Sequence, residues 1–233
     1  MLKLTKEQMS AKQAFILQYL SAKNPADGSK MDANANVTTK NVATLEAELM
    51  KDYFIQVNRN LVSDKISELF GDALAHEYVR QIEEHEIYVH DETSLKPYCA
   101  SISLYPFLLD GLTKLGGESK APKHLASFCG SFINLVFTVS AQFAGAIATV
   151  EFLTYFDYFA RKEFGDQYLM SHRHEIDNHL QHVVYALNQP AAARGYQSVF
   201  WNISIYDKFY FDSLFEGFVF PEYSTPNWSS VKH

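Results

Sequence analysis

Four histidines lie within one short stretch, HRHEIDNHLQHVVYAL, and they are the first residues whose spacing could do chemistry. They are His172, His174, His179 and His182, and Glu175 would share one helix face with the last two. The stretch has neither an HExxH motif nor the cysteines of a structural zinc site. A solvated or partner-facing helix surface is therefore the preferred interpretation, and no metal site is predicted in this chain.

The two cysteines of the chain differ in their surroundings. Cys99 lies in the polar and aromatic stretch KPYCAS, where a thiol could be presented to a pocket, although a lone cysteine is more often a small buried hydrophobe. Cys129 lies on an apolar helix, where packing is the favoured interpretation. Two cysteines in a chain of this size make no disulfide framework, so reduced thiols are expected.

Two lysines, Lys120 and Lys123, follow the glycine pair Gly116 and Gly117 and precede a predicted helix. The N-terminus of a helix beside two lysines could hold a phosphate. Taken alone, a simple turn between helices explains this segment better. The chain has no GxxxxGK[ST] loop and no GxGxxG fingerprint, so the usual nucleotide-binding motifs are missing.

Long helices must position these residues, because apolar side chains recur at helical spacing through most of the chain. Helices are predicted over residues 5–22, 42–57, 61–69, 72–84, 101–115, 121–143, 149–163 and 172–187. Pro122 suits the first turn of the sixth helix. Residues 86–90 and 198–205 are predicted to be short strands, and two lone strands make no self-sufficient sheet. They would need neighbouring strands from elsewhere.

Composition limits the class of protein. A chain of 233 residues that is 47% hydrophobic can bury a sizeable core, so a folded body is expected. A net charge of −7 argues against a surface that binds nucleic acid, which needs clustered Lys and Arg. No apolar run suits a signal peptide or a membrane span. A cytoplasmic protein with no membrane or nucleic-acid partner is the expectation.

Five segments, in this order, resemble motifs of the anaerobic ribonucleoside-triphosphate reductases, the oxygen-sensitive class of glycyl radical enzymes. They are DANANVTTK, EHEIYVHDETS, KPYCASISLYPFLLDGL, GGESKAPKHLASFCGSFINLVFTVSAQFAGA and RGYQSVFWNISIYD. The resemblance covers about residues 30–228. The chain departs from the family pattern at Tyr88, Ala121 and Val199, which stand where a histidine and two prolines are common.

The resemblance implies a mostly helical α/β fold that forms the N-terminal part of a ten-stranded barrel. Residues 1–30 would be an N-terminal helix and loop, and residues 31–233 the barrel part with its dimer and effector helices. In that family a glycyl radical raises a thiyl radical, which takes hydrogen from the ribose 3′ carbon of a nucleotide. The start of the chain also looks too short for the family's ATP-cone regulatory domain.

The radical-bearing elements of the family are missing from this sequence. No cysteine follows Cys129, and neither the Arg-Val-Cys-Gly-Tyr-like glycyl loop nor the four-cysteine zinc site occurs. The expected partner is therefore a C-terminal reductase chain that carries the glycyl radical and the zinc site. A radical-activating enzyme with an iron–sulfur cluster and S-adenosylmethionine is the second expected partner, and no cofactor is expected in this chain.

The same resemblance assigns site residues. Cys99 matches the second active-site cysteine, which assists loss of the 2′ hydroxyl, and His90 matches a histidine that could orient the ribonucleotide substrate or transfer a proton. Gln197, Ser198 and Asn202 fall on the last predicted strand, whose alternate residues should face the barrel interior.

The family also binds a deoxynucleotide effector between helices at its dimer interface. The matching helices are 101–115 and 121–143. Lys123 matches a lysine of that site, whereas Lys120 stands where an acidic residue is common and Asn134 where a glutamine is. The apolar face of the second helix would then be buried against a second copy of the chain; its residues are Phe128, Phe132, Leu135 and Val139.

Two alternatives stay open from the sequence. One keeps the fold without the chemistry, as a catalytically inactive helical dimer that binds nucleotides and is left by a disrupted gene. The other is a glycyl radical enzyme of the pyruvate formate-lyase kind.

Overall fold

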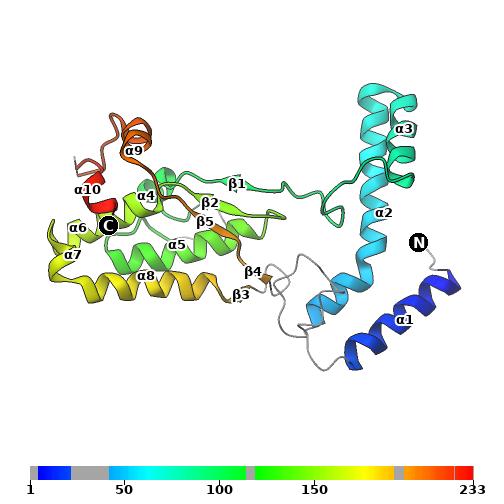
Figure 1. The fold of residues 1–233 in the computed structure, drawn as a ribbon, viewed down its shortest axis with the longest axis horizontal. Coiled ribbons are helices and arrows are strands. Elements are labelled where there is room, and N and C mark those ends of the chain that lie inside the picture. Colours follow the sequence, from blue (N-terminus) through cyan, green and yellow to red (C-terminus); the bar gives the residue numbers. More distant parts are fainter. Residues whose placement is uncertain (1–4, 22–41, 114–118, 192–196, 223, 233) are drawn as a thin grey trace. The chain divides into compact units, whose positions relative to one another are not determined.

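A computed structural model describes residues 5–21, 42–113, 119–191, 197–222 and 224–232. The described residues form two compact units that divide between Lys96 and Pro97, with Gln197 grouped with the first unit. The predicted domain boundary at residue 30 lies outside the described residues. Figure 1 shows the elements of both units.

The first unit is helical, as predicted. It contains α1 (Lys6–Ser21), α2 (Val42–Phe70) and α3 (Asp72–Glu83). The two helices predicted over 42–57 and 61–69 are one continuous helix, α2. Gly71, with a positive φ of 93°, ends α2 and allows α3 to fold back along it.

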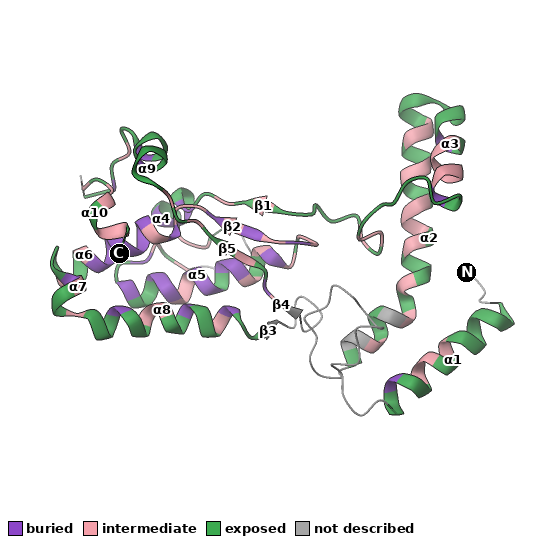
Figure 2. Cartoon of the chain, viewed as in Figure 1, coloured by how far each residue is buried: buried purple, intermediate pink, exposed green. Residues whose placement is uncertain are grey.

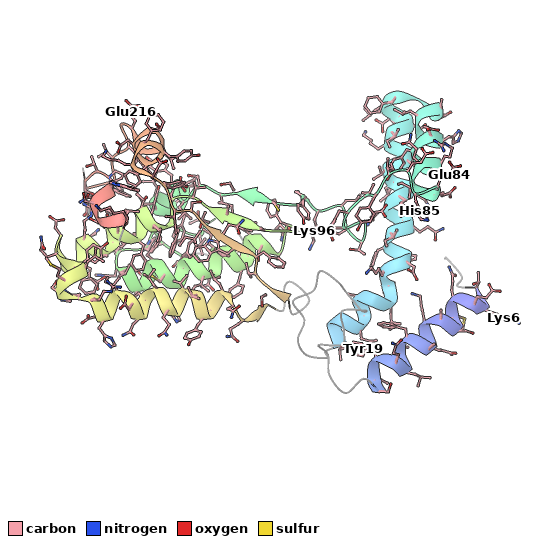
Figure 3. The ribbon with its side chains drawn as sticks, in the orientation of Figure 1. Lys6, Tyr19, Glu84, His85, Lys96 and Glu216 are labelled. Atoms are coloured by element: carbon pink, nitrogen blue, oxygen red, sulfur yellow. The ribbon has the colours of Figure 1, made fainter. Side chains whose placement is uncertain are left out.

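The strand predicted at residues 86–90 is wrong. His85 takes a positive φ of 61°, which reverses the chain at the end of α3. The backbone amides of Glu86 and Ile87 then both donate to the carbonyl of Gln81, at 2.8 and 3.2 Å. Figure 3 shows His85 beside the helix pair α2 and α3. The segment therefore closes the helix end instead of extending, and the alternation of apolar residues was misleading.

The second unit contains a three-stranded parallel sheet, in the order β1-β2-β5. The strands are β1 (Ala100–Ser101), β2 (Ile147–Thr149) and β5 (Trp201–Ile203). The predicted strand at 198–205 is confirmed at its centre by β5, whereas β1 and β2 were not predicted, because two or three residues carry no readable alternation. A separate small sheet consists of β3 (Pro190–Ala191) and β4 (Gln197–Ser198).

Four helices of the second unit lie at predicted positions and are shorter than predicted. They are α4 (Tyr105–Asp110), α5 (Leu125–Ser140), α6 (Phe152–Phe164) and α8 (Arg173–Leu187). The unit also contains α7 (Tyr168–Ser171), α9 (Lys208–Phe215) and α10 (Trp228–Val231), which lie outside the predicted helix ranges. Gly111, at a positive φ of 72°, stops α4 well before the predicted end at residue 115. The helix predicted from 121 begins at Leu125, so Pro122 lies outside its first turn.

Aromatic side chains form the core of the second unit. Phe132 of α5 lies with its ring centroid 4.5 Å from Phe152 of α6 and 5.4 Å from Trp201 of β5. Helices α5 and α8 run side by side, and Figure 2 shows buried residues concentrated on α5, α6 and β2. Each fully buried Phe side chain contributes about 1.5–3 kcal/mol to folding.

This core corrects the predicted dimer contact. Phe128 and Phe132 have no exposed surface and Leu135 has 5% within the single chain, and Val139 packs against the same cluster. The apolar face of α5 is filled by α6, α8 and β5 of its own chain, so it is not available to a second copy.

The described residues form a mostly helical protein with a small parallel sheet. No described helix is both long and apolar enough to cross a membrane.

Candidate functional site

The two faces of the β1-β2-β5 sheet have different environments. Ile147 and Thr149 of β2 are completely buried. Trp201 pairs with Ile147 in the register and donates its indole N–H to the hydroxyl of Thr149, at 2.7 Å. Because Trp201 also contacts Phe132 and Phe152, this face packs against α5 and α6. The opposite face is left open in the described chain.

Cys99 and Asn202 share the open face. Asn202 pairs with Ala148, and Ala148 with Ser101, so these three side chains lie in one row on the face opposite Trp201. Cys99 precedes Ser101 by two residues and therefore points to the same face, where its thiol is exposed. Strand spacing and rise put the Cα atoms of Cys99 and Asn202 about 12 Å apart. A ribose between the two side chains can fill that span.

The thiol of Cys99 has a defined partner. Its Sγ accepts a hydrogen bond from the backbone amide of Ala146, at 3.2 Å. The buried Gly145 lies directly beside it, and a Cβ at that position would be 2.7 Å from the sulfur. The neighbours on the open face are small, Ala146 just before β2 and Ala148 on it, so no large side chain of this strand stands beside the thiol.

Glu151 anchors the end of the sheet that leads into α4. Its carboxylate accepts from the hydroxyl of Ser103 at 2.9 Å and from the backbone amide of Leu104 at 2.7 Å. The carboxylate thereby caps the first turn of α4 and ties β1 to the β2–α6 connection. The strand that presents Cys99 is fixed at both of its ends.

His90 belongs to the first unit and is described within that unit alone. Its Nδ1 lies 2.7 Å from the carboxylate of Asp91, and both side chains are partly exposed. A carboxylate at Nδ1 favours the tautomer with the proton on that nitrogen. The His–Asp pair thus exists as a local unit, presented by the irregular segment after α3.

Ser198 and Gln197 lie on β4, in the separate small sheet, and not on the strand that carries Asn202. Ser198 is half-buried, and the side chain of Gln197 lies outside the described residues. The expected continuous strand from Gln197 to Asn202 is wrong, because residues 199 and 200 leave the strand conformation.

The effector candidates lie before and along α5, the two lysines ahead of its first residue and Asn134 in its middle. Lys120, Lys123 and Asn134 are all exposed. The segment with the lysines is held by an antiparallel bridge between Leu112 and Ser119, where Gly111 allows a close approach of the backbones. From Leu125 to Asn134 the helix rises by about 14 Å, which a nucleotide triphosphate can span.

A carboxylate already occupies part of that helix end. The backbone amide of Leu125 donates to Glu163 of α6, at 2.9 Å. Glu163 stabilises the start of α5 and brings a negative charge to the amide of Leu125, two residues after Lys123 in the sequence. An anionic ligand there has to overcome this charge.

Comparison with known proteins gives the family. The family model for anaerobic ribonucleoside-triphosphate reductase (NRDD) matches residues 46–217. The chain belongs to this family. Among curated proteins none matches the chain.

Solved reductase structures share the fold over nearly the whole chain. The anaerobic ribonucleotide reductase from Thermotoga maritima, with citrate in the active site, is 25% identical over 97% of this chain, with a TM-score of 0.76. Another anaerobic ribonucleotide reductase is 28% identical over 97%, with a TM-score of 0.77. The Thermotoga maritima enzyme in complex with dATP and CTP, at 23% identity and a TM-score of 0.74, shows the shared fold. The chain spans 38%, 34% and 40% of these three proteins.

Family membership favours a ribonucleotide reductase over an enzyme of the pyruvate formate-lyase kind. Within the described residues of this reductase-family chain, no group of three His, Cys, Asp or Glu could hold a metal ion. His172 stacks on Phe164, with ring centroids 4.7 Å apart, while His174 and His182 are exposed on α8. The histidine cluster thus covers a helix surface.

The reductase motifs assigned no role to Gly145, Ala146, Glu151 or Glu163, although Gly145 and Ala146 lie at the end of the fourth motif segment. Their contacts reach across 38 to 48 residues of sequence, so no local pattern reports them. The one available signal was a glycine within the apolar run AGAIATV, which is typical of a close backbone approach.

Proposed function

We propose that this chain is the N-terminal catalytic part of an anaerobic ribonucleotide reductase. Together with a C-terminal chain it would reduce ribonucleoside triphosphates to deoxyribonucleotides by glycyl radical chemistry. The observation that carries the proposal is the shared open face of Cys99 and Asn202 in a chain of the reductase family. A small parallel sheet with one open face also suits the start of a ten-stranded barrel, because further strands would pair with its edges and the open face would then line the barrel interior.

The proposed chemistry gives each of these groups a role. A thiyl radical on the C-terminal chain takes the 3′ hydrogen of the ribose. After the 2′ hydroxyl leaves as water, the Cys99 thiol, on the other side of the substrate, would give a hydrogen atom to carbon 2′. An external two-electron donor, formate or a thiol protein, would return Cys99 to the thiol and complete the reduction. Asn202 would hold the sugar by hydrogen bonds, since its amide both donates and accepts. His90, oriented by Asp91, would position the substrate or move a proton.

The chain would act in a larger assembly. The C-terminal chain would carry the glycyl radical and the zinc site, and an activating enzyme with an iron–sulfur cluster and S-adenosylmethionine would generate the radical. A homodimer through α4 and α5 would use the polar exposed face of α5, which carries Ser127, Asn134 and Thr138.

The effector site would lie at the start of the same helix. Lys120 and Lys123 would bind the phosphates of a deoxynucleotide, and Asn134 would approach its base. Lysine ammonium groups are suited to phosphates as point charges.

The test is reconstitution under anaerobic conditions. Affinity purification of the chain from its host, followed by intact mass spectrometry, should reveal a second polypeptide with a Cys-Gly-Tyr glycyl loop. Mixed with that polypeptide and the activating enzyme, the chain should support reduction, and the Cys99→Ser variant should fold but not turn over, because a hydroxyl cannot undergo the thiol redox step. Turnover by Cys99→Ser would refute the catalytic assignment.

A second candidate is a nucleotide-binding protein without catalysis. The observation in its favour is that all three effector candidates lie in one compact unit of this chain. It predicts deoxynucleotide binding in calorimetry with no second polypeptide in the purified assembly. Reduction by the reconstituted mixture would exclude it.

A further inference from the structure

The first and second strands of the sheet lose their regular pairing beside Cys99. Ala100 donates to Ala146 at 3.1 Å, and Ile102 donates to Ala148 at 2.9 Å, which is the even spacing of a parallel ladder. One step earlier, the same ladder would join the amide of Ala146 to the carbonyl of Tyr98. Instead the amide of Gly145 donates to Tyr98, at 2.6 Å. The pairing is therefore displaced by one residue at Gly145.

The displacement gives the amide of Ala146 a different acceptor. Its N–H donates to the Sγ of Cys99, at 3.2 Å, in place of the carbonyl that a regular ladder would offer. A backbone amide has a fixed direction, so this bond selects one orientation of the thiol.

Only a residue without a Cβ fits at the point of displacement. A Cβ on Gly145 would lie 2.7 Å from Cys99 Sγ and 2.8 Å from the carbonyl oxygen of Tyr98. Gly145 does not have a positive φ, so the requirement concerns space and not backbone torsion. The glycine thus lets the two strands approach while the thiol stays on the open face.

We propose that Gly145 and the backbone amide of Ala146 are the positioning elements of the Cys99 thiol. Gly145 permits the shifted pairing, the shift turns the Ala146 amide toward the sulfur, and the amide fixes the thiol toward the open face. The functional meaning of this arrangement rests on the proposed reductase function, but its geometry does not.

The first test measures the rate at which iodoacetamide alkylates Cys99 in the full chain. The signal is specific, because the other cysteine, Cys129, is 1% exposed and burial raises the pKa of its thiol to about 12. In Gly145→Ala the added methyl displaces the thiol from its amide donor. Alkylation should slow by about tenfold, which corresponds to a loss of about 1.4 kcal/mol in the stabilisation of the reactive thiol orientation.

Gly130→Ala is the matched control. Gly130 lies on α5, and a Cβ added there would have no neighbouring atom within 4 Å, so the same change of residue should leave Cys99 alkylation unaltered. Equal rates in Gly145→Ala, Gly130→Ala and the unchanged chain would overturn the proposal.

A double-mutant cycle covers the case in which Gly145→Ala is poorly folded. Urea midpoints are measured for Gly145→Ala, Cys99→Ala and the double variant. Because Cys99→Ala removes the sulfur, Gly145→Ala should lower the midpoint less in that background. Equal losses in both backgrounds would show that Gly145 does not act on the thiol.

These readouts are independent of catalysis. Failed reconstitution with normal coupling would remove the reductase function and leave the positioning of Cys99 intact. Normal reduction without coupling between Gly145 and Cys99 would support the reductase function and refute the positioning of Cys99 by Gly145.

Discussion

Replacing Lys123 with Ala tests the electrostatics at the start of α5. Lys123 is exposed, so its attraction to a phosphate is screened by water and is worth about 1 kcal/mol, at the upper end of exposed ion pairs. The affinity for dATP should therefore fall by about fivefold. Isothermal titration calorimetry at low salt measures this loss, which should shrink as the ionic strength rises.

Glu163→Gln should act in the opposite direction. The Gln side chain keeps an oxygen that can accept from the Leu125 amide, now 2.9 Å from Glu163, but removes the negative charge at the start of α5. Binding of dATP should strengthen by about two- to fivefold, because one like charge near the phosphate is lost. The same titrations measure it.

Lys232→Ala is the control, since Lys232 is another exposed lysine of the same unit, at the end of α10. If Lys123→Ala and Lys232→Ala bind dATP equally, Lys123 is no phosphate contact. If Glu163→Gln leaves the affinity unchanged, the phosphate does not reach the start of α5.

Two other predictions concern the packing of the second unit and the ion pairs of the first. Phe132→Ala removes a fully buried ring between α6 and β5 and should lower the free energy of unfolding by about 3–5 kcal/mol in urea titrations; a loss below about 1 kcal/mol would contradict the packing. Hydrogen bonds from Arg80 and Gln81 lower the pKa of Glu77 to about 2. The ionised Glu77 carboxylate therefore contributes to folding stability at neutral pH, and this contribution is lost as the pH falls through about 2. Arg80→Gln should return the pKa of Glu77 toward about 4.3 in NMR titrations. A Glu77 that titrates alike in both chains would refute the coupling.

The longer helices could be predicted because each repeats its apolar positions over several turns. α6 and α8 bury the faces that their periodicity indicated, with ends that glycines or capping residues adjusted, whereas the described side chains of α2 stay partly or largely exposed. The strands could not be predicted in the same way. β1 and β2 are two and three residues long, and the apparent strand at 86–90 became a helix end through the positive φ of His85.

The sequence by itself determined the family motifs, the reduced state expected of two cysteines, and the choice of Cys99 as the residue to examine. Tertiary structure alone decided that Asn202 shares its face, that Glu163 stands at the start of α5, and that Ala146 aims its amide at the sulfur. The apolar face of α5 shows the same division. Its residues were readable as a buried stripe, but whether a second copy or the chain itself would cover it depended on long-range packing. Local patterns fix which side chains avoid water, whereas the partner that covers them is set by contacts between distant parts of the chain.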